Sequence, residues 1–148
     1  AQAVTAANAC NVPGAITISA WVYPLSVAGA QTLVNKWYAM DSYMLSIQNG
    51  QFSFSLAFPN GSWGTVKSVS APAATNKWQH VVAQYDGASI RIYVDKVLYA
   101  TVAASGGIQA STRPVSMGNH PSWNKYYGYM KNVKIYNASV PVSDIATY

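Results

Sequence analysis

A β-hairpin is predicted by the stretch Trp78-Gln79-His80-Val81-Val82-Ala83-Gln84-Tyr85-Asp86-Gly87-Ala88-Ser89-Ile90-Arg91-Ile92-Tyr93-Val94-Asp95. Two alternating runs flank the Asp-Gly pair, which tolerates the positive φ angles that a tight hairpin turn requires. Valine, isoleucine and tyrosine favour the pleated, half-buried surface of a strand. We therefore expect two antiparallel strands that meet at Asp86-Gly87.

The rest of the chain shows short alternating runs separated by turn residues. In 16–23, apolar side chains at even positions share one face, and 52–57 alternates in the same way after the turn pair Asn49-Gly50. A further strand over 97–102 pairs with 90–94. No segment sustains a helical period, so the pattern predicts an all-β sandwich of two antiparallel sheets in a jelly-roll arrangement. One short helical turn is expected in the C-terminal tail, 140–146.

The order of these motifs resembles the laminin-G-like and pentraxin-like group of the concanavalin A-like lectin superfamily. Members typically carry a Trp-x-His-Val-Ala strand, a Tyr-Asp-Gly turn and a Tyr-Val-Asp-Gly strand, and here Lys96 stands where the family usually has glycine. Four further segments match family strands in the same order: Thr17–Pro24, Leu33–Lys36, Val115–Asn119 and Tyr127–Asn137. The resemblance covers nearly the whole chain and implies one laminin-G-like domain over 1–148.

Composition limits the function classes. The 148 residues include 51% hydrophobic and 9% charged side chains, which does not suit a disordered chain. No apolar run reaches the length of about 18 residues that a membrane-spanning helix needs. The net charge is +5, but the basic residues are scattered, so no nucleic-acid patch is indicated. The positive balance fits an anionic partner such as an acidic polysaccharide, or ordinary solubility.

Cys10 is the single cysteine of the chain, so it has no partner for an internal disulfide. The family resemblance implies a secreted, extracellular protein, and an exposed free thiol is a liability there. We therefore expect Cys10 to be buried.

The inventory of acids argues against glycoside hydrolysis. The chain has no glutamate, and its four acids are Asp41, Asp86, Asp95 and Asp144. Glycosidases usually need two carboxylates about 5–10 Å apart. Asp86 and Asp95 have turn positions, and Asp144 suits the dipole of a terminal helical turn. Only Asp41 lacks a local role.

The two histidines do not by themselves make a catalytic site. His80 lies mid-strand, and the resemblance implies a structural role packed under the sheet. His120 lies in a loop, where it is a candidate for ligand contact. Related jelly-roll lyases use Tyr, His, Arg and Gln, so a lyase site at Tyr126 and His120 stays open as an alternative. No nucleophile elbow and no Cys/His metal spacing accompany them.

Tryptophans in polar loops indicate a ligand surface. Core packing is expected for Trp21 and Trp78, which fall inside strand motifs, whereas Trp37, Trp63 and Trp123 fall outside them. A sugar ring stacks on an indole while nearby polar groups bond its hydroxyls; alternatively, each ring covers an edge of the sandwich. The candidate ligand residues are Trp37, Tyr38, Trp63, Asn119, His120, Trp123, Lys125 and Tyr126.

The resemblance also implies a calcium site. Pentraxin-like relatives hold calcium with acids from the loop after the second strand and from the loop after a glycine-ending strand. Asp41 matches the leading acid of the first loop, but 119–123 has no acid. Strict antiparallel alternation would place the two loops at opposite ends, and the resemblance alone brings them together. We expect calcium binding at Asp41, if it occurs, to be weak.

Three functions remain in view. The first is a non-catalytic, lectin-like module that recognises a glycan or cell-surface polysaccharide through loop aromatics. The second is a structural or adhesive domain that contacts other proteins or copies of itself, because low charge with many Tyr and Trp also suits a protein interface. The third is a polysaccharide lyase or hydrolase, which the lack of glutamate disfavours.

Overall fold

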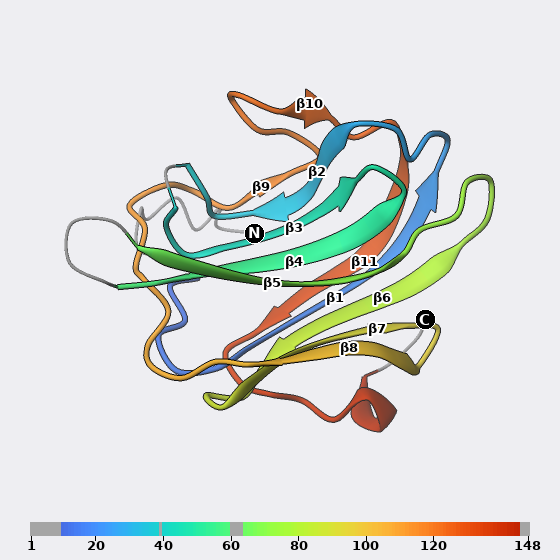
Figure 1. The fold of residues 1–148 in the computed structure, drawn as a ribbon. Coiled ribbons are helices and arrows are strands. Elements are labelled where there is room, and N and C mark those ends of the chain that lie inside the picture. The colour runs from blue at the N-terminus through green and yellow to red at the C-terminus, as the bar shows by residue number, and fades with distance from the viewer. Residues whose placement is uncertain (1–9, 39, 60–63, 146–148) are drawn as a thin grey trace, which may run out of the picture.

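The structure is a computed structural model that describes residues 10–38, 40–59 and 64–145 (Figure 1). Strands dominate these residues, with one 3₁₀ turn, η1 (Val142–Asp144), near the C-terminal end. The strands are β1 (Ile16–Pro24), β2 (Ala30–Asn35), β3 (Tyr43–Gln48), β4 (Gln51–Phe58), β5 (Thr65–Pro72), β6 (Gln79–Tyr85), β7 (Ser89–Val94), β8 (Val97–Ala103), β9 (Ser116–Met117), β10 (Asn124–Lys125) and β11 (Gly128–Tyr136).

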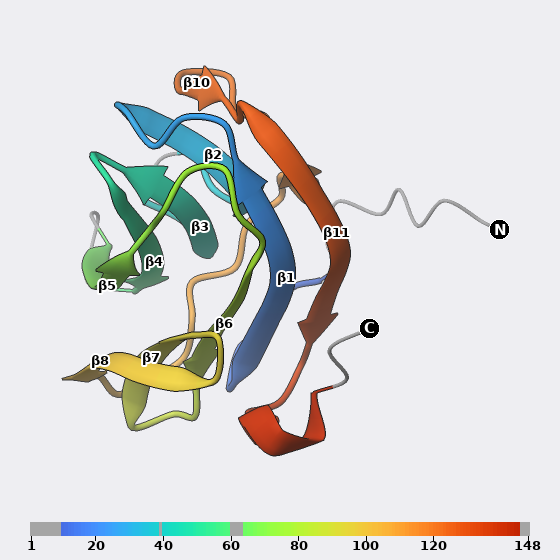
Figure 2. The ribbon, with the colours of Figure 1, turned by 90° about the vertical axis from the view of Figure 1, so that its right-hand side faces the viewer.

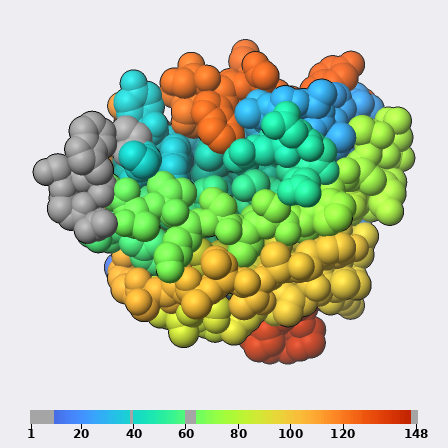
Figure 3. All heavy atoms as spheres, in the orientation of Figure 1, coloured from blue at the N-terminus to red at the C-terminus, as the bar shows by residue number. Residues whose placement is uncertain are grey.

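The strands form two sheets, which Figure 2 shows as separate layers. Sheet A has the order β11-β1-β6-β7-β8, and sheet B has the order β10-β2-β3-β4-β5 with β9 also paired to β2. The ladders are antiparallel except for the short parallel pairing of β10 with β2. The edge strands β5 and β8 lie alongside each other and close one side of the sandwich (Figure 3). The predicted all-β sandwich and terminal turn are confirmed.

The core lies between the sheets, and the predicted alternation places it there. Ile16, Ile18, Ala20 and Val22 of β1 are fully buried, as are Phe52, Phe54 and Leu56 of β4. Each aliphatic or aromatic side chain buried in this way stabilises the fold by about 1.5–3 kcal/mol. The alternate side chains of β1 lie on the outer face of sheet A.

The predicted hairpin around Asp86-Gly87 is confirmed as β6 and β7. Asp86 accepts backbone N–H bonds from Ala88 and Ser89 at 2.9 and 2.8 Å, and Gly87 has φ +93°. The other carboxylate oxygen of Asp86 pairs with the Arg91 guanidinium at 2.6 Å. Hydrogen bonds lower the pKa of the Asp86 carboxyl: the Ala88 N–H has the largest effect, and the Ser89 N–H and Arg91 add to it. Burial raises this pKa, but by less than the Ala88 N–H lowers it. The carboxylate therefore holds the turn as an anion.

Three expectations about packing are wrong. Cys10 is exposed, at a turn position before β1. Trp78 is 38% exposed and Trp21 is half-buried, because both lie on the outer face of sheet A and not between the two sheets. His80 is buried as expected, but it pairs with Trp21 on this outer face and not under the sheet.

Candidate functional site

Two loops far apart in sequence meet at the end of β2. Asn35, the last residue of that strand, pairs with Ser116 of β9, and its side chain is buried. The Asn35 amide donates to the backbone oxygen of Asn119 at 2.9 Å and, more weakly, to that of Ser116 at 3.4 Å. The segment that follows β9 is thereby fixed beside the loop that follows β2. The adjacency implied by the family resemblance is present in the structure.

His120 fastens the same two loops through its ring. Its side chain is buried, its Nδ1 accepts the backbone N–H of Ser122 at 3.0 Å, and its Nε2 lies 3.1 Å from the backbone oxygen of Trp37. Because Nδ1 accepts, the ring proton of the neutral imidazole is on Nε2, which donates to Trp37. Both ring nitrogens are therefore bonded to main chain, and the histidine joins the loops.

Lys36 and Asp41 complete the support beneath the surface. Lys36 is fully buried, and its Nζ donates to the backbone oxygen of Arg113 at 2.6 Å. Burial lowers the pKa of Lys36, against smaller opposing effects of Cys10 and Asp41. The Asp41 carboxylate accepts the backbone N–H of Tyr38 at 2.7 Å and so shapes the loop from within.

A hollow of about 100 Å³ lies above these contacts. We call it the loop groove; its lining residues are Asn35, Trp37, Tyr38, Arg113, Pro114, Ser116 and Pro121. The Arg113 guanidinium stacks over the Tyr38 ring, 4.0 Å from its centroid, and Tyr38 is 48% exposed. The groove therefore presents an aromatic wall, a cation with several N–H donors, and amide and hydroxyl groups.

The structure separates the candidate ligand residues into three groups. Trp37 and Tyr38 line the groove, whereas Trp123 is not among its lining residues and is half-buried with its ring 5.9 Å from that of His120. Asn119 is exposed on the same loop, whereas Trp63 lies outside the described residues. Lys125 and Tyr126 do not line the groove: Lys125 belongs to β10 and pairs with Thr32, nearer the start of β2.

Arg113 was missed by sequence reasoning. It lies two residues before the segment Val115–Asn119, which the motif order identifies as a strand but does not pair with β2. The pairing of Asn35 with Ser116 places Arg113 against Tyr38. Arg113 could be identified as a groove residue only from a prediction of which strands are neighbours, because no local motif marks it.

The donor set at Asp41 does not fit a calcium site of the usual kind. Calcium takes six to eight oxygen ligands and usually recruits several carboxylates. Asp41 already uses one oxygen for Tyr38, and the 119–123 loop has no acid to add. Within residues 10–38, 40–59 and 64–145, no cluster of three or more His, Cys, Asp or Glu side chains is placed to hold a metal.

The arrangement of acids and bases bears on catalysis. Asp86 and Asp95 lie at opposite ends of the six-residue strand β7, so about 20 Å or more separates them. The Tyr126 hydroxyl donates to the backbone oxygen of Tyr129 at 3.1 Å, and burial raises its pKa far above the usual range. Both ring nitrogens of His120 are bonded to main chain, and the Tyr126 hydroxyl keeps its proton. Neither of these two described side chains is therefore ready to take a proton from a substrate.

Comparison with known proteins identifies the family. A profile described as the concanavalin A-like lectin/glucanases superfamily, of laminin-G type, matches residues 1–146. The chain belongs to this superfamily. No curated protein sequence matches it. Among the described residues of this superfamily member, no helix has the length and apolar character needed to cross a membrane.

Several solved structures share the fold. The binding domain of botulinum neurotoxin serotype G superposes with a TM-score of 0.71 at 14% identity, over 90% of this chain and 35% of that one. The receptor-binding domain of the C/D mosaic serotype gives 0.68 at 15%, over 90% and 35%. The binding domain of neurotoxin DC, in complex with rat synaptotagmin II, gives 0.68 at 14%, over 91% and 35%. The chain spans about a third of the length of these proteins, and at such identities the likeness is one of fold.

Proposed function

We propose that this chain is a non-catalytic carbohydrate-binding module whose glycan ligand occupies the loop groove. The observation that carries the proposal is the stack of Arg113 on Tyr38 above a buried polar framework. Aromatic rings accept the C–H face of a pyranose, and a guanidinium donates several bonds to sugar hydroxyls or carboxylates. Trp37 and Trp123 extend this surface along the two loops.

Preorganisation favours binding over a structural role for the groove. Asn35, Lys36 and His120 are buried and bond to main chain across the two loops. A ligand that enters therefore finds the loops already ordered, which reduces the entropy lost on association. In this proposal His120 and Asn35 position the loops, and Tyr38, Arg113 and Trp123 contact the sugar.

Similar folds are used for recognition in other proteins. The binding domain of neurotoxin DC occurs in complex with SialylT, and cell entry of neurotoxin type C depends on interaction with two ganglioside molecules. The proposal for this chain rests on its own groove and the superfamily. It places the protein outside the cell, where glycans and polysaccharides are displayed.

A glycan array tests the proposal with matched variants. Tyr38→Ala and Arg113→Ala remove one member of the stack each, and Lys77→Ala removes a cation from an exposed turn before β6 as a control. We expect the two groove variants to lose binding by about tenfold or more, as for a charge-assisted bond, while the control binds normally. If neither groove variant weakens any of the glycan signals of the wild type, or if no glycan binds, the proposal is contradicted.

A second candidate function is self-association through β8. Val97, Leu98 and Tyr99 are consecutive on this edge strand and 55%, 49% and 50% exposed. Exposed edge strands offer unpaired backbone groups to a second chain. Light scattering distinguishes the candidates: self-association predicts a dimer that Leu98→Lys dissociates, and a concentration-independent monomer argues against it.

A further inference from the structure

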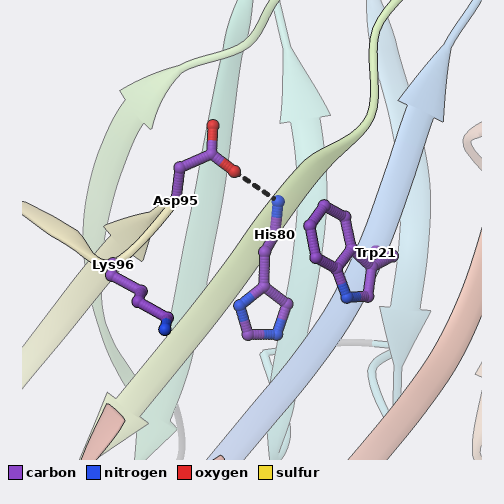
Figure 4. A pocket seen from close by; sticks show the side chains of 4 residues that line it. All are labelled: Trp21, His80, Asp95 and Lys96. Carbon is purple, nitrogen blue, oxygen red and sulfur yellow. Dashed lines mark hydrogen bonds between the residues drawn. The ribbon is translucent and has the colours of Figure 1, made fainter. Parts of the chain in front are cut away.

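The outer face of sheet A carries a second hollow, remote from the loop groove on sheet B. Its volume is about 210 Å³, and Trp21 of β1, His80 of β6, and Asp95 and Lys96 of the β7–β8 turn line it. Figure 4 shows the His80 imidazole between the Lys96 side chain and the Trp21 indole. We call it the sheet pocket.

His80 is the unusual group of the sheet pocket. It is only 2% exposed, its Nε2 lies 2.8 Å from Ser19 Oγ, and its Nδ1 has no hydrogen-bond partner in the described structure. Buried polar groups are nearly always bonded, so a nitrogen without a partner in a pocket wall calls for an explanation. When the Ser19 hydroxyl donates to Nε2, Nδ1 carries the ring proton and has nothing to receive it.

The turn beside His80 is held rigidly and is strained. Asp95 Oδ1 accepts the backbone N–H of His80 at 2.9 Å, and the Asp95 N–H donates to the His80 oxygen at 2.8 Å. Asp95 and Lys96 have φ of +50° and +69°, a conformation in which glycine or asparagine is preferred over lysine. Strained residues persist at ligand sites more often than elsewhere. This turn brings the Lys96 side chain to the pocket.

Aromatic rings and further cations surround the sheet pocket. Lys131 of β11 lies over Trp78 at 4.4 Å and over Trp21 at 5.9 Å. Tyr23 contacts Trp78 and Tyr129 with ring centroids 5.5 and 6.0 Å apart. Lys134 pairs with Ser19 on the same face. The lysines outnumber the Asp95 carboxylate among these groups, so the surface attracts anions.

We propose that the sheet pocket is a second ligand site, which binds an acidic sugar unit. The ring stacks on Trp21, its carboxylate or sulfate group faces Lys96, and one of its oxygens accepts the proton of His80 Nδ1. Aromatic rings, N–H donors and lysine cations together fit an acidic sugar better than a neutral one, because a neutral sugar has no negative charge to pair with the lysines. The site does not depend on the loop groove, so the chain would bind a glycan at two separate sites.

Calorimetric titration of the full chain carrying Arg113→Ala, which disables the loop groove, tests the pocket with three probes: trigalacturonate, a sulfated chondroitin disaccharide and neutral cellotriose. The first two separate carboxylate from sulfate recognition. We expect an acidic probe to bind and cellotriose to bind at least about tenfold more weakly. Binding of cellotriose as tight as that of both acidic probes, or no binding of either acidic probe, overturns the proposal.

Lys96→Gly is the sharpest variant, because glycine accepts the positive φ of this turn without strain. We expect an unchanged or higher Tm together with a loss of acidic-probe affinity of about ten- to hundredfold. Trp21→Ala should weaken binding and Trp21→Phe should restore part of it. Tyr38→Ala, in the loop groove, should leave the affinity for the acidic probe unchanged. If this variant abolishes acidic-probe binding, the probe binds in the groove and the pocket assignment is wrong.

A ¹⁵N spectrum of the His80 ring gives a readout that a purely structural role would not move. Saturation with the acidic probe should shift the Nδ1 signal as it gains an acceptor, and the His120 signals should stay in place. An unchanged Nδ1 signal in a saturated complex contradicts the contact proposed for His80.

Discussion

His120 donates its Nε2 proton to the backbone oxygen of Trp37 at 3.1 Å, which joins two loops 83 residues apart in the sequence. The same ring accepts the N–H of Ser122, so one buried side chain sets the course of both loops. Everything proposed for the loop groove depends on this junction, because Tyr38 follows directly from one side of it and Trp123 from the other.

Replacement of His120 by alanine should therefore loosen the groove. The variant leaves the Trp37 oxygen and the Ser122 N–H without their partner, and we expect the free energy of unfolding to fall by about 2–3 kcal/mol. Hydrogen exchange should rise in 36–38 and 119–123 and remain unchanged in β6 and β7. Urea unfolding and exchange mass spectrometry measure the two effects. Uniform loss of protection throughout the chain would show that His120 supports the fold in general.

Trp78 is expected to contribute little to stability, in contrast to its sequence assignment to the core. Its ring is 38% exposed on the outer face of sheet A, whereas Phe54 is fully buried between the sheets. We expect Trp78→Ala to lower the free energy of unfolding by about 1 kcal/mol and Phe54→Ala by about 3–5 kcal/mol. Chemical denaturation of the pair measures this difference. Equal losses would mean that the outer face is packed against something the monomer does not contain.

His80 should make the fold sensitive to acid. Burial first, with Lys96 and Lys134 in addition, lowers its pKa below 6.5 against the opposing effect of Asp95. The unfolded chain therefore binds a proton at a higher pH than the folded chain, so stability is full above about pH 6.5 and falls as the pH drops through the lowered pKa. In the His80→Gln variant, Tm should change less with pH between about pH 7.5 and 5.5 than in the wild type. This holds even if the variant has a different Tm at neutral pH. A slope as steep as that of the wild type would assign the effect to other groups.

Calcium, if it binds, should bind weakly at Asp41. One carboxylate, already engaged with Tyr38, supports at most an affinity in the range of about 10⁻⁴–10⁻³ M. Asp41→Asn keeps an oxygen for the Tyr38 N–H while removing the charge, so it should abolish the calorimetric signal without lowering the Tm. Submicromolar binding by chelator-stripped protein, or binding that survives the variant, would place the site elsewhere.

The sequence determined the hairpin and the sandwich because their causes are local. Asp86 and Gly87 form their turn from their own backbone and side chains, and the alternation in β1 fixes which residues share a face. Alternation does not tell which aromatic residues have a second layer above them, so Trp21 and Trp78 were misplaced. The stack of Arg113 on Tyr38 depends on the pairing of Asn35 with Ser116, which no local pattern encodes.

Lys36 offers a test that separates loop position from stability. Its buried ammonium donates to the Arg113 oxygen, and methionine has nearly the same volume without the charge. Removal of a buried charge relieves its desolvation, which offsets part of the cost of leaving the Arg113 oxygen without this donor. We expect Lys36→Met to change the free energy of unfolding by less than about 2 kcal/mol. Glycan binding should nevertheless weaken by about tenfold, because the Arg113 guanidinium is no longer fixed over Tyr38. Full affinity in a folded Lys36→Met protein would show that Arg113 finds its place without this anchor.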